Sequence, residues 1–129
     1  MPKGSKILIA DDDHMLATMY QERLEIAGYP TIVCKNGEET LSKVQEERPD
    51  VVLLDIMMPR LNGFETLVSL KSDPLTKDIP VIMISVLTRD FNRGRAIDAG
   101  ASDYLIKSEA TPGDIVAAIE QTLKRKKEN

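Results

Sequence analysis

Short apolar segments recur along the chain, and they limit the possible folds more than any other feature of the sequence. Four of them are rich in leucine or β-branched residues and cover residues 7–9, 31–33, 51–54 and 81–84. A fifth and weaker segment covers residues 104–106. Continuous apolar runs of this length are typical of strands that are buried on both faces, as in a parallel sheet.

The segments between these runs have the spacing of amphipathic helices. In the first segment the apolar residues follow helical intervals: Leu16, Met19, Tyr20, Leu24 and Ala27. Gly28 then provides a helix end. Shorter patterns at residues 41–44, 64–68, 91–97 and 112–123 predict four more helices. Five strands that alternate with five helices favour one doubly wound α/β domain, although alternation alone does not determine the order of the strands.

The composition excludes several classes of protein. The 129 residues have the size of one domain, and no apolar run approaches the roughly 20 residues of a membrane-spanning helix. The N-terminus lacks the apolar core of a signal peptide, and the one cysteine, Cys34, cannot form an internal disulfide, so we expect a cytoplasmic protein. Four basic residues at 124–127 leave residues 1–123 with a net charge of −7, which disfavours nucleic-acid binding by this chain.

Polar residues stand where four of the predicted strands end. They are Asp11, Asp12 and Asp13 after the first strand, Asp55 after the third, Ser85 after the fourth and Lys107 after the fifth. Parallel strands bring these ends to one edge of the sheet, so the side chains should converge. Clustered carboxylates repel one another unless a cation holds them, and Mg²⁺ is the natural candidate. Carboxylates, a hydroxyl and an ammonium group together suit the transfer of a phosphoryl group to a carboxylate.

Other phosphate-binding folds do not match this sequence. It contains neither the G-x-x-x-x-G-K-[ST] pattern of the P-loop nor the G-x-G-x-x-G turn of dinucleotide-binding domains. The three carboxylates after the first strand would also repel a pyrophosphate. Any one of the strand-end residues alone would be about as typical of a helix cap as of chemistry, but four matched strand ends favour a site.

At these residues the sequence resembles the receiver domain of two-component response regulators, including chemotaxis regulators. The resemblance extends from Lys6 to about Lys124, so we expect a single receiver domain over residues 1–129 with a basic tail at 124–129. The matching motifs lie at residues 7–12, 51–59, 62–63, 81–85, 100–104 and at Lys107. The resemblance implies a flavodoxin-like (βα)5 fold with strand order 2-1-3-4-5.

The resemblance also implies roles for the acidic residues. Asp55 would accept a phosphoryl group from a histidine kinase or a phosphotransfer protein. Asp12 and Asp55 would bind Mg²⁺ directly and Asp11 through water, with the backbone carbonyl of Met57 as a further ligand. Asp13 fits an N-cap of the first helix better than a role in the site.

Further implied roles concern how the signal leaves the site. Ser85 corresponds to the switch hydroxyl, Lys107 to the phosphate-binding lysine and Tyr104 to the aromatic residue that reports the switch. The surface that changes would comprise the fourth helix, the fifth strand and the fifth helix, at which a partner or a second copy of the receiver would dock. Such a domain is not an enzyme in the ordinary sense, because it catalyses only its own phosphorylation and dephosphorylation.

Two features are particular to this sequence. The family usually has a cis proline after the lysine, but Ser108 follows Lys107 here, and a cis bond before another residue costs about 2.5–4 kcal/mol. Either the strain is retained or the loop is rebuilt. In addition, apolar Met57 and Leu87 stand at positions that flank the phosphoryl group in the family, which predicts a comparatively long-lived phosphorylated state.

Two other functions are considered beside the signalling switch. Asp11 and Asp13 form a D-x-D pair after an apolar strand, as in aspartate-nucleophile phosphatases, but a second acidic cluster and a cap segment are missing. A receiver-like scaffold that is never phosphorylated is the other possibility, and the intact set of acids, serine and lysine argues against it.

Overall fold

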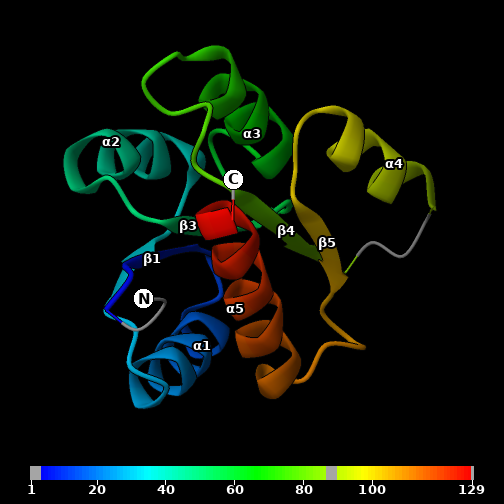
Figure 1. The fold of residues 1–129 in the computed structure, drawn as a ribbon. Helices are drawn as coiled ribbons and strands as arrows, with labels where there is room; N and C mark the ends of the chain where they lie inside the picture. Colours follow the sequence, from blue (N-terminus) through cyan, green and yellow to red (C-terminus); the bar gives the residue numbers. More distant parts are fainter. Residues whose placement is uncertain (1–3, 87–89, 129) are drawn as a thin grey trace.

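The computed structural model contains one parallel five-stranded sheet with the order β2-β1-β3-β4-β5, which confirms the expected fold (Figure 1). The structure describes residues 4–86 and 90–128. The strands are β1 (Ile7–Ala10), β2 (Thr31–Cys34), β3 (Val51–Asp55), β4 (Val81–Ser85) and β5 (Asp103–Ile106). Three of them are fully buried, as the continuous apolar runs predict.

Five helices cover the two faces of this sheet. They are α1 (His14–Ile26), α2 (Gly37–Glu47), α3 (Gly63–Ser72), α4 (Asp90–Asp98) and α5 (Pro112–Glu128). One core cluster joins the sheet to α1 and α5, and a second joins the other face to α2, α3 and α4 (Figure 1). No helix within residues 4–86 and 90–128 combines the length and the apolar character that crossing a lipid bilayer requires.

The strand register aligns the carboxyl ends of β1, β3, β4 and β5. Ala10 pairs with Leu54, Asp55 with Ile84, and Ser85 with Ile106. Asp55 and Ser85 are therefore the last residues of their strands, and β3 and β4 each extend one residue beyond the apolar runs at 51–54 and 81–84. The ladder continues through them because their backbone groups still have partners on the neighbouring strand.

The connection from β3 to α3 brings the helix close to the end of the strand. Asn62 and Glu65 form a capping box, in which each side chain accepts a hydrogen bond from the other residue's backbone N–H. A Cβ at Gly63 would overlap the carbonyl oxygen of Asp55. Glycine at this position therefore permits the close approach that fixes the loop beside Asp55.

Candidate functional site

Three carboxylates gather at the carboxyl edge of the sheet, as the strand ends predict. One oxygen atom each from Asp11, Asp12 and Asp55 lies within 4.8 Å of the other two. Asp11 and Asp55 are buried, with 1% and 2% of their surface exposed, whereas Asp12 is exposed. The backbone orients the two buried groups, because the N–H of Asp13 donates to Oδ1 of Asp11 and the N–H of Met57 donates to Oδ1 of Asp55.

Lys107, the residue after β5, brings a positive charge into this cluster. Its Nζ atom lies 3.0 Å from Oδ2 of Asp11 and 3.2 Å from Oδ2 of Asp55. The ammonium group donates a hydrogen bond to Asp55, but its approach to Asp11 is an ion pair without hydrogen-bond geometry. Oδ2 of Asp11 is thus buried with no hydrogen-bond partner among the described residues, which suits a cation ligand.

These contacts shift the pKa values of the two partners. Burial and the charge of Asp11 raise the pKa of Asp55 to about 6, against the opposing effects of Lys107 and of the Met57 N–H. Burial lowers the pKa of Lys107, but its contacts with Asp11 and Asp55 outweigh this effect and raise the pKa overall. Lys107 therefore stays charged. In the metal-free cluster, Asp55 keeps its proton to a higher pH than an ordinary carboxyl group does.

The loop after Lys107 is rebuilt, which decides between the two alternatives that Ser108 leaves open. No peptide bond among the described residues is cis, so the bond between Lys107 and Ser108 is trans. The N–H groups of Glu109 and Ala110 both donate to the carbonyl oxygen of Ile106, which closes a tight turn. The N–H of Lys107 donates to the Ser85 carbonyl, so the lysine is held at the end of β4 without a proline.

The two predicted switch residues are close to each other on the neighbouring strands β4 and β5. Ser85 and Tyr104 are buried, with 0% and 1% of their surface exposed. Burial raises the pKa of Tyr104, and a side-chain hydrogen bond with Ser85 opposes this rise. The tyrosine ring is therefore inside the protein in this structure.

Other predicted residues are placed as follows. The Met57 side chain is 56% exposed beside Asp55, and a role for its backbone carbonyl stays a prediction. Leu87 lies outside the described residues. Asp13 caps α1 by accepting a hydrogen bond from the N–H of Leu16, as expected.

Two residues near the site have positions that the sequence does not indicate. Tyr20 of α1 is buried close enough to the cluster that Lys107, Asp11 and Asp55 all influence its pKa, which burial raises. Its helical spacing indicated only a core position. Arg93 of α4 lies over the Tyr104 ring, and no pattern in the sequence links these two residues.

Comparison with known proteins identifies the class to which this fold and site belong. The chain is a member of the response regulator receiver domain family, whose model matches residues 7–120. Membership implies phosphorylation-dependent signalling in a two-component system, in which receiver domains interact with histidine kinases.

Individual relatives agree with this membership. The chain is 34% identical over 122 residues to the alkaline phosphatase synthesis transcriptional regulatory protein PhoP of Bacillus subtilis, covering 95% of this chain and 50% of that protein. It is 35% identical over 122 residues to the phosphate regulon transcriptional regulatory protein PhoB of Pseudomonas aeruginosa, covering 95% of this chain and 53% of that protein. The chain thus spans about half the length of these curated relatives.

A solved structure shows the same arrangement of elements. The CheY-like response regulator receiver domain protein from Methanospirillum hungatei superposes with a TM-score of 0.90 and 27% sequence identity. The match covers 98% of each chain.

Proposed function

We propose that Asp55 accepts a phosphoryl group and that this event switches the receiver between two signalling states. The observation that carries the proposal is the contact of Lys107 with both Asp11 and Asp55 at the edge of the sheet. Asp55 is the buried carboxylate with an N–H donor on one oxygen and an ammonium group on the other. Such a carboxylate is held in one orientation, which favours in-line attack on phosphorus.

The donor in this proposal is a phosphohistidine on a histidine kinase or on a phosphotransfer protein. A carboxylate oxygen of Asp55 forms a bond to phosphorus, and the bond from phosphorus to the histidine nitrogen breaks with its electron pair. The nitrogen keeps those electrons and can take a proton from solvent. Because the pKa of Asp55 is about 6, most of the carboxylate is ionised at about pH 7 and ready to attack.

The acidic cluster fits a divalent cation. Asp11, Asp12 and Asp55 would hold Mg²⁺, and Oδ2 of Asp11, which forms an ion pair with Lys107 but no hydrogen bond, is a suitable oxygen ligand or acceptor from a metal-bound water. We also assign the Met57 carbonyl to this ligand set. When bound, Mg²⁺ would neutralise the carboxylates and the charge on the transferred phosphoryl oxygens.

The output of the switch begins at Ser85 and Tyr104. A phosphoryl group on Asp55 adds strong acceptor oxygens at the end of β3, next to Ser85 on β4. When the serine hydroxyl donates to a phosphoryl oxygen, its contact with Tyr104 changes. The α4–β5–α5 surface then repacks and offers a docking site for a partner or for a second copy of the receiver.

A phosphatase of the D-x-D type is less well supported. Its second carboxylate would be Asp13, but the side chain of Asp13 caps α1 through the N–H of Leu16. That carboxylate is therefore engaged in holding a helix end.

Intact mass spectrometry tests the proposal. With a small phosphodonor such as acetyl phosphate and Mg²⁺, the wild-type chain should gain one phosphoryl group and Asp55→Asn none. Asp13→Asn is the matched control, because asparagine also caps a helix and the variant should be phosphorylated as the wild type is. Absence of any gain in the wild type would favour the scaffold, and a full gain in Asp55→Asn would contradict the assignment.

A further inference from the structure

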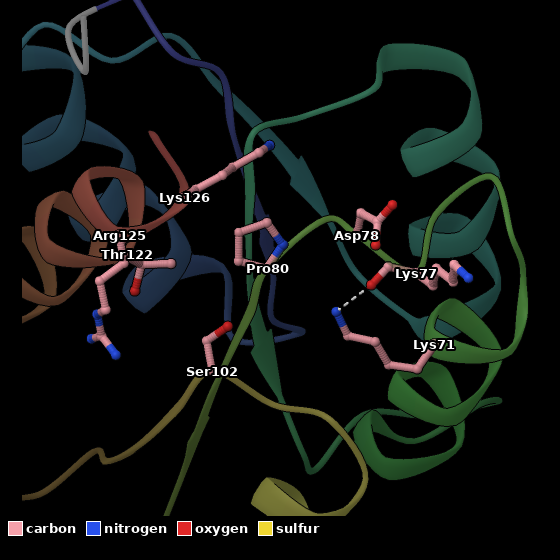
Figure 2. Close-up of a pocket in the computed structure, with 8 residues that line it drawn as sticks. All are labelled: Lys71, Lys77, Asp78, Pro80, Ser102, Thr122, Arg125 and Lys126. Atoms are coloured by element: carbon pink, nitrogen blue, oxygen red, sulfur yellow. Dashed lines mark hydrogen bonds between the residues drawn. The ribbon is translucent and has the colours of Figure 1, made fainter. Parts of the chain in front are cut away.

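A groove lies at the opposite end of the sheet from the acidic cluster. It has a volume of about 620 Å³ and is bordered by the end of α5 and by the residues that precede β4 and β5 (Figure 2). The residues that line it are Lys71, Lys77, Asp78, Pro80, Ser102, Thr122, Arg125 and Lys126. This volume is within the usual range of sites for small molecules.

The groove is basic on a protein that is acidic as a whole. Its five charged residues carry a net charge of +3, whereas the whole chain carries −4. A concave basic surface with low-dielectric walls concentrates anions from solution. The positive charge of the groove therefore favours a negatively charged ligand.

Several of the charges already have structural roles. Lys71 donates through Nζ to the carbonyl oxygens of Lys77 and Ile79, at 2.9 and 2.8 Å, and so fixes the loop before β4. The charge of Asp78 acts on Lys71, whose pKa burial lowers overall. Lys126 lies 4.0 Å from a carboxylate oxygen of Asp50.

Arg125 carries a charge of the groove that the fold does not use, as does Lys77, whose side chain has no hydrogen bond or ion pair among the described residues. The Arg125 side chain is exposed on α5, and within the described part of the chain it makes no hydrogen bond or ion pair. In Figure 2 it extends from α5 on the same side of the groove as Thr122. A guanidinium group can present two parallel N–H donors to a phosphate.

Two hydroxyl groups add neutral donors to the walls. Thr122 is 4% exposed, and its Oγ1 atom has no hydrogen-bond partner among the described residues. Ser102 faces the groove from the position just before β5, where its N–H donates to the Val81 carbonyl over 2.8 Å and fixes its backbone (Figure 2). A buried hydroxyl without a partner is uncommon in proteins, and a ligand oxygen would supply one once the Thr122 side chain turns its hydroxyl toward the groove.

We propose that this groove binds a phosphate-bearing small molecule, with the guanidinium of Arg125 and the hydroxyl of Thr122 as its principal donors. Compact oxygens with several negative charges match a guanidinium and two hydroxyls better than an extended acidic peptide does, because these donors line one groove. The site lies at the amino ends of β4 and β5, away from Asp55, and its ligand binding does not depend on phosphorylation. It would give the receiver a second, non-covalent input.

NMR titration of the metal-free full chain with tripolyphosphate tests this site. Saturable amide shifts are expected at Ser102, Thr122 and Arg125. Arg125→Gln should raise the dissociation constant about tenfold, because it removes a charged donor. Thr122→Val keeps the side-chain volume and should raise it about threefold.

Lys124→Gln is the matched control, because it removes one positive charge from the neighbouring position of α5, which does not line the groove. The dissociation constant of Lys124→Gln for tripolyphosphate should stay within about twofold of the wild-type value. Equal weakening by Lys124→Gln and Arg125→Gln, shifts centred on the acidic cluster, or no saturable binding would overturn the proposal. Tighter binding of a hexaglutamate peptide than of tripolyphosphate would also overturn it and identify a docking surface for acidic proteins.

Discussion

The guanidinium carbon of Arg93 lies 5.6 Å from the centroid of the Tyr104 ring. A cation at this distance over an aromatic face is attracted by the ring quadrupole. Arg93 comes from α4 and Tyr104 from β5, and the tyrosine in turn bonds to Ser85 at the end of β4. These contacts connect the proposed phosphorylation site with the surface of α4 through three side chains.

Replacing Arg93 with alanine should alter the titration of Tyr104. Burial raises the pKa of the tyrosine, whereas the Arg93 charge lowers it, so the pKa in Arg93→Ala should rise further. NMR titration of selectively labelled tyrosine measures this value. Arg95→Ala is the control, because Arg95 lies over the ring of Phe64 at 4.2 Å and should leave Tyr104 unchanged. An unchanged Tyr104 titration in Arg93→Ala would show that the contact is weak in solution.

Added Mg²⁺ should raise the thermal midpoint of the wild-type protein. The ion relieves the repulsion among three carboxylates and binds the folded state alone. In Asp12→Ala the rise should be much smaller, and differential scanning calorimetry can measure both. Asp13→Asn should respond to Mg²⁺ as the wild type does, because the cap of α1 lies outside the ligand set. An equal rise in the wild type and in Asp12→Ala would count against the metal site.

The metal-free protein should lose stability as the pH rises through the titration of Asp55. The pKa of this residue is about 6 in the folded state and 3.8 ordinarily, so the folded state binds more protons in this interval. The free energy of unfolding contributed by Asp55 therefore falls as the pH rises from about 4 to about 6. Asp55→Asn should be about 1–3 kcal/mol more stable than the wild type at about pH 7.5 and nearly equal at about pH 4.

Urea unfolding in metal-free buffer at several pH values checks this difference. The comparison with Asp55→Asn cancels the other carboxylates, which titrate in both proteins. If Asp55→Asn is instead less stable than the wild type at about pH 7.5, the Lys107 contact outweighs the burial of Asp55 and its repulsion from Asp11.

Met57 is expected to slow the loss of the phosphoryl group. Its side chain is 56% exposed beside Asp55, where an apolar group hinders an attacking water. Met57→Glu and Met57→Asn should both change the dephosphorylation rate, which loss of the added mass over time measures. An unaltered rate in both variants would show that the side chain is passive.

Sequence patterns predict the strands and the gathering of the strand-end side chains at one edge of the sheet. The apolar runs predict the strands because β1, β3 and β4 are buried on both faces, and the polar residues at their ends predict where the site lies. The sequence predicts the buried faces of the helices less accurately. Met19 and Val68 fit the apolar stripes but are 40% and 52% exposed.

Contacts between elements distant in the chain could not be predicted. The Arg93 contact with Tyr104 depends on how α4 packs against β5, and the basic groove depends on where α5 ends relative to the loop before β4. The sequence does not decide the backbone conformation after Lys107. That conformation depends on local hydrogen bonds to the Ile106 carbonyl, which the presence of Ser108 alone does not indicate.

Chemical trapping of the acyl phosphate tests the central claim most directly. Borohydride reduces an aspartyl phosphate to homoserine and leaves an unmodified aspartate intact, so peptide mapping by mass spectrometry locates the phosphorylated residue. After treatment with acetyl phosphate and Mg²⁺, homoserine should appear at residue 55 and at no other acid of the cluster. Homoserine at residue 11, 12 or 13 would contradict the assignment of Asp55 as the phosphoryl acceptor.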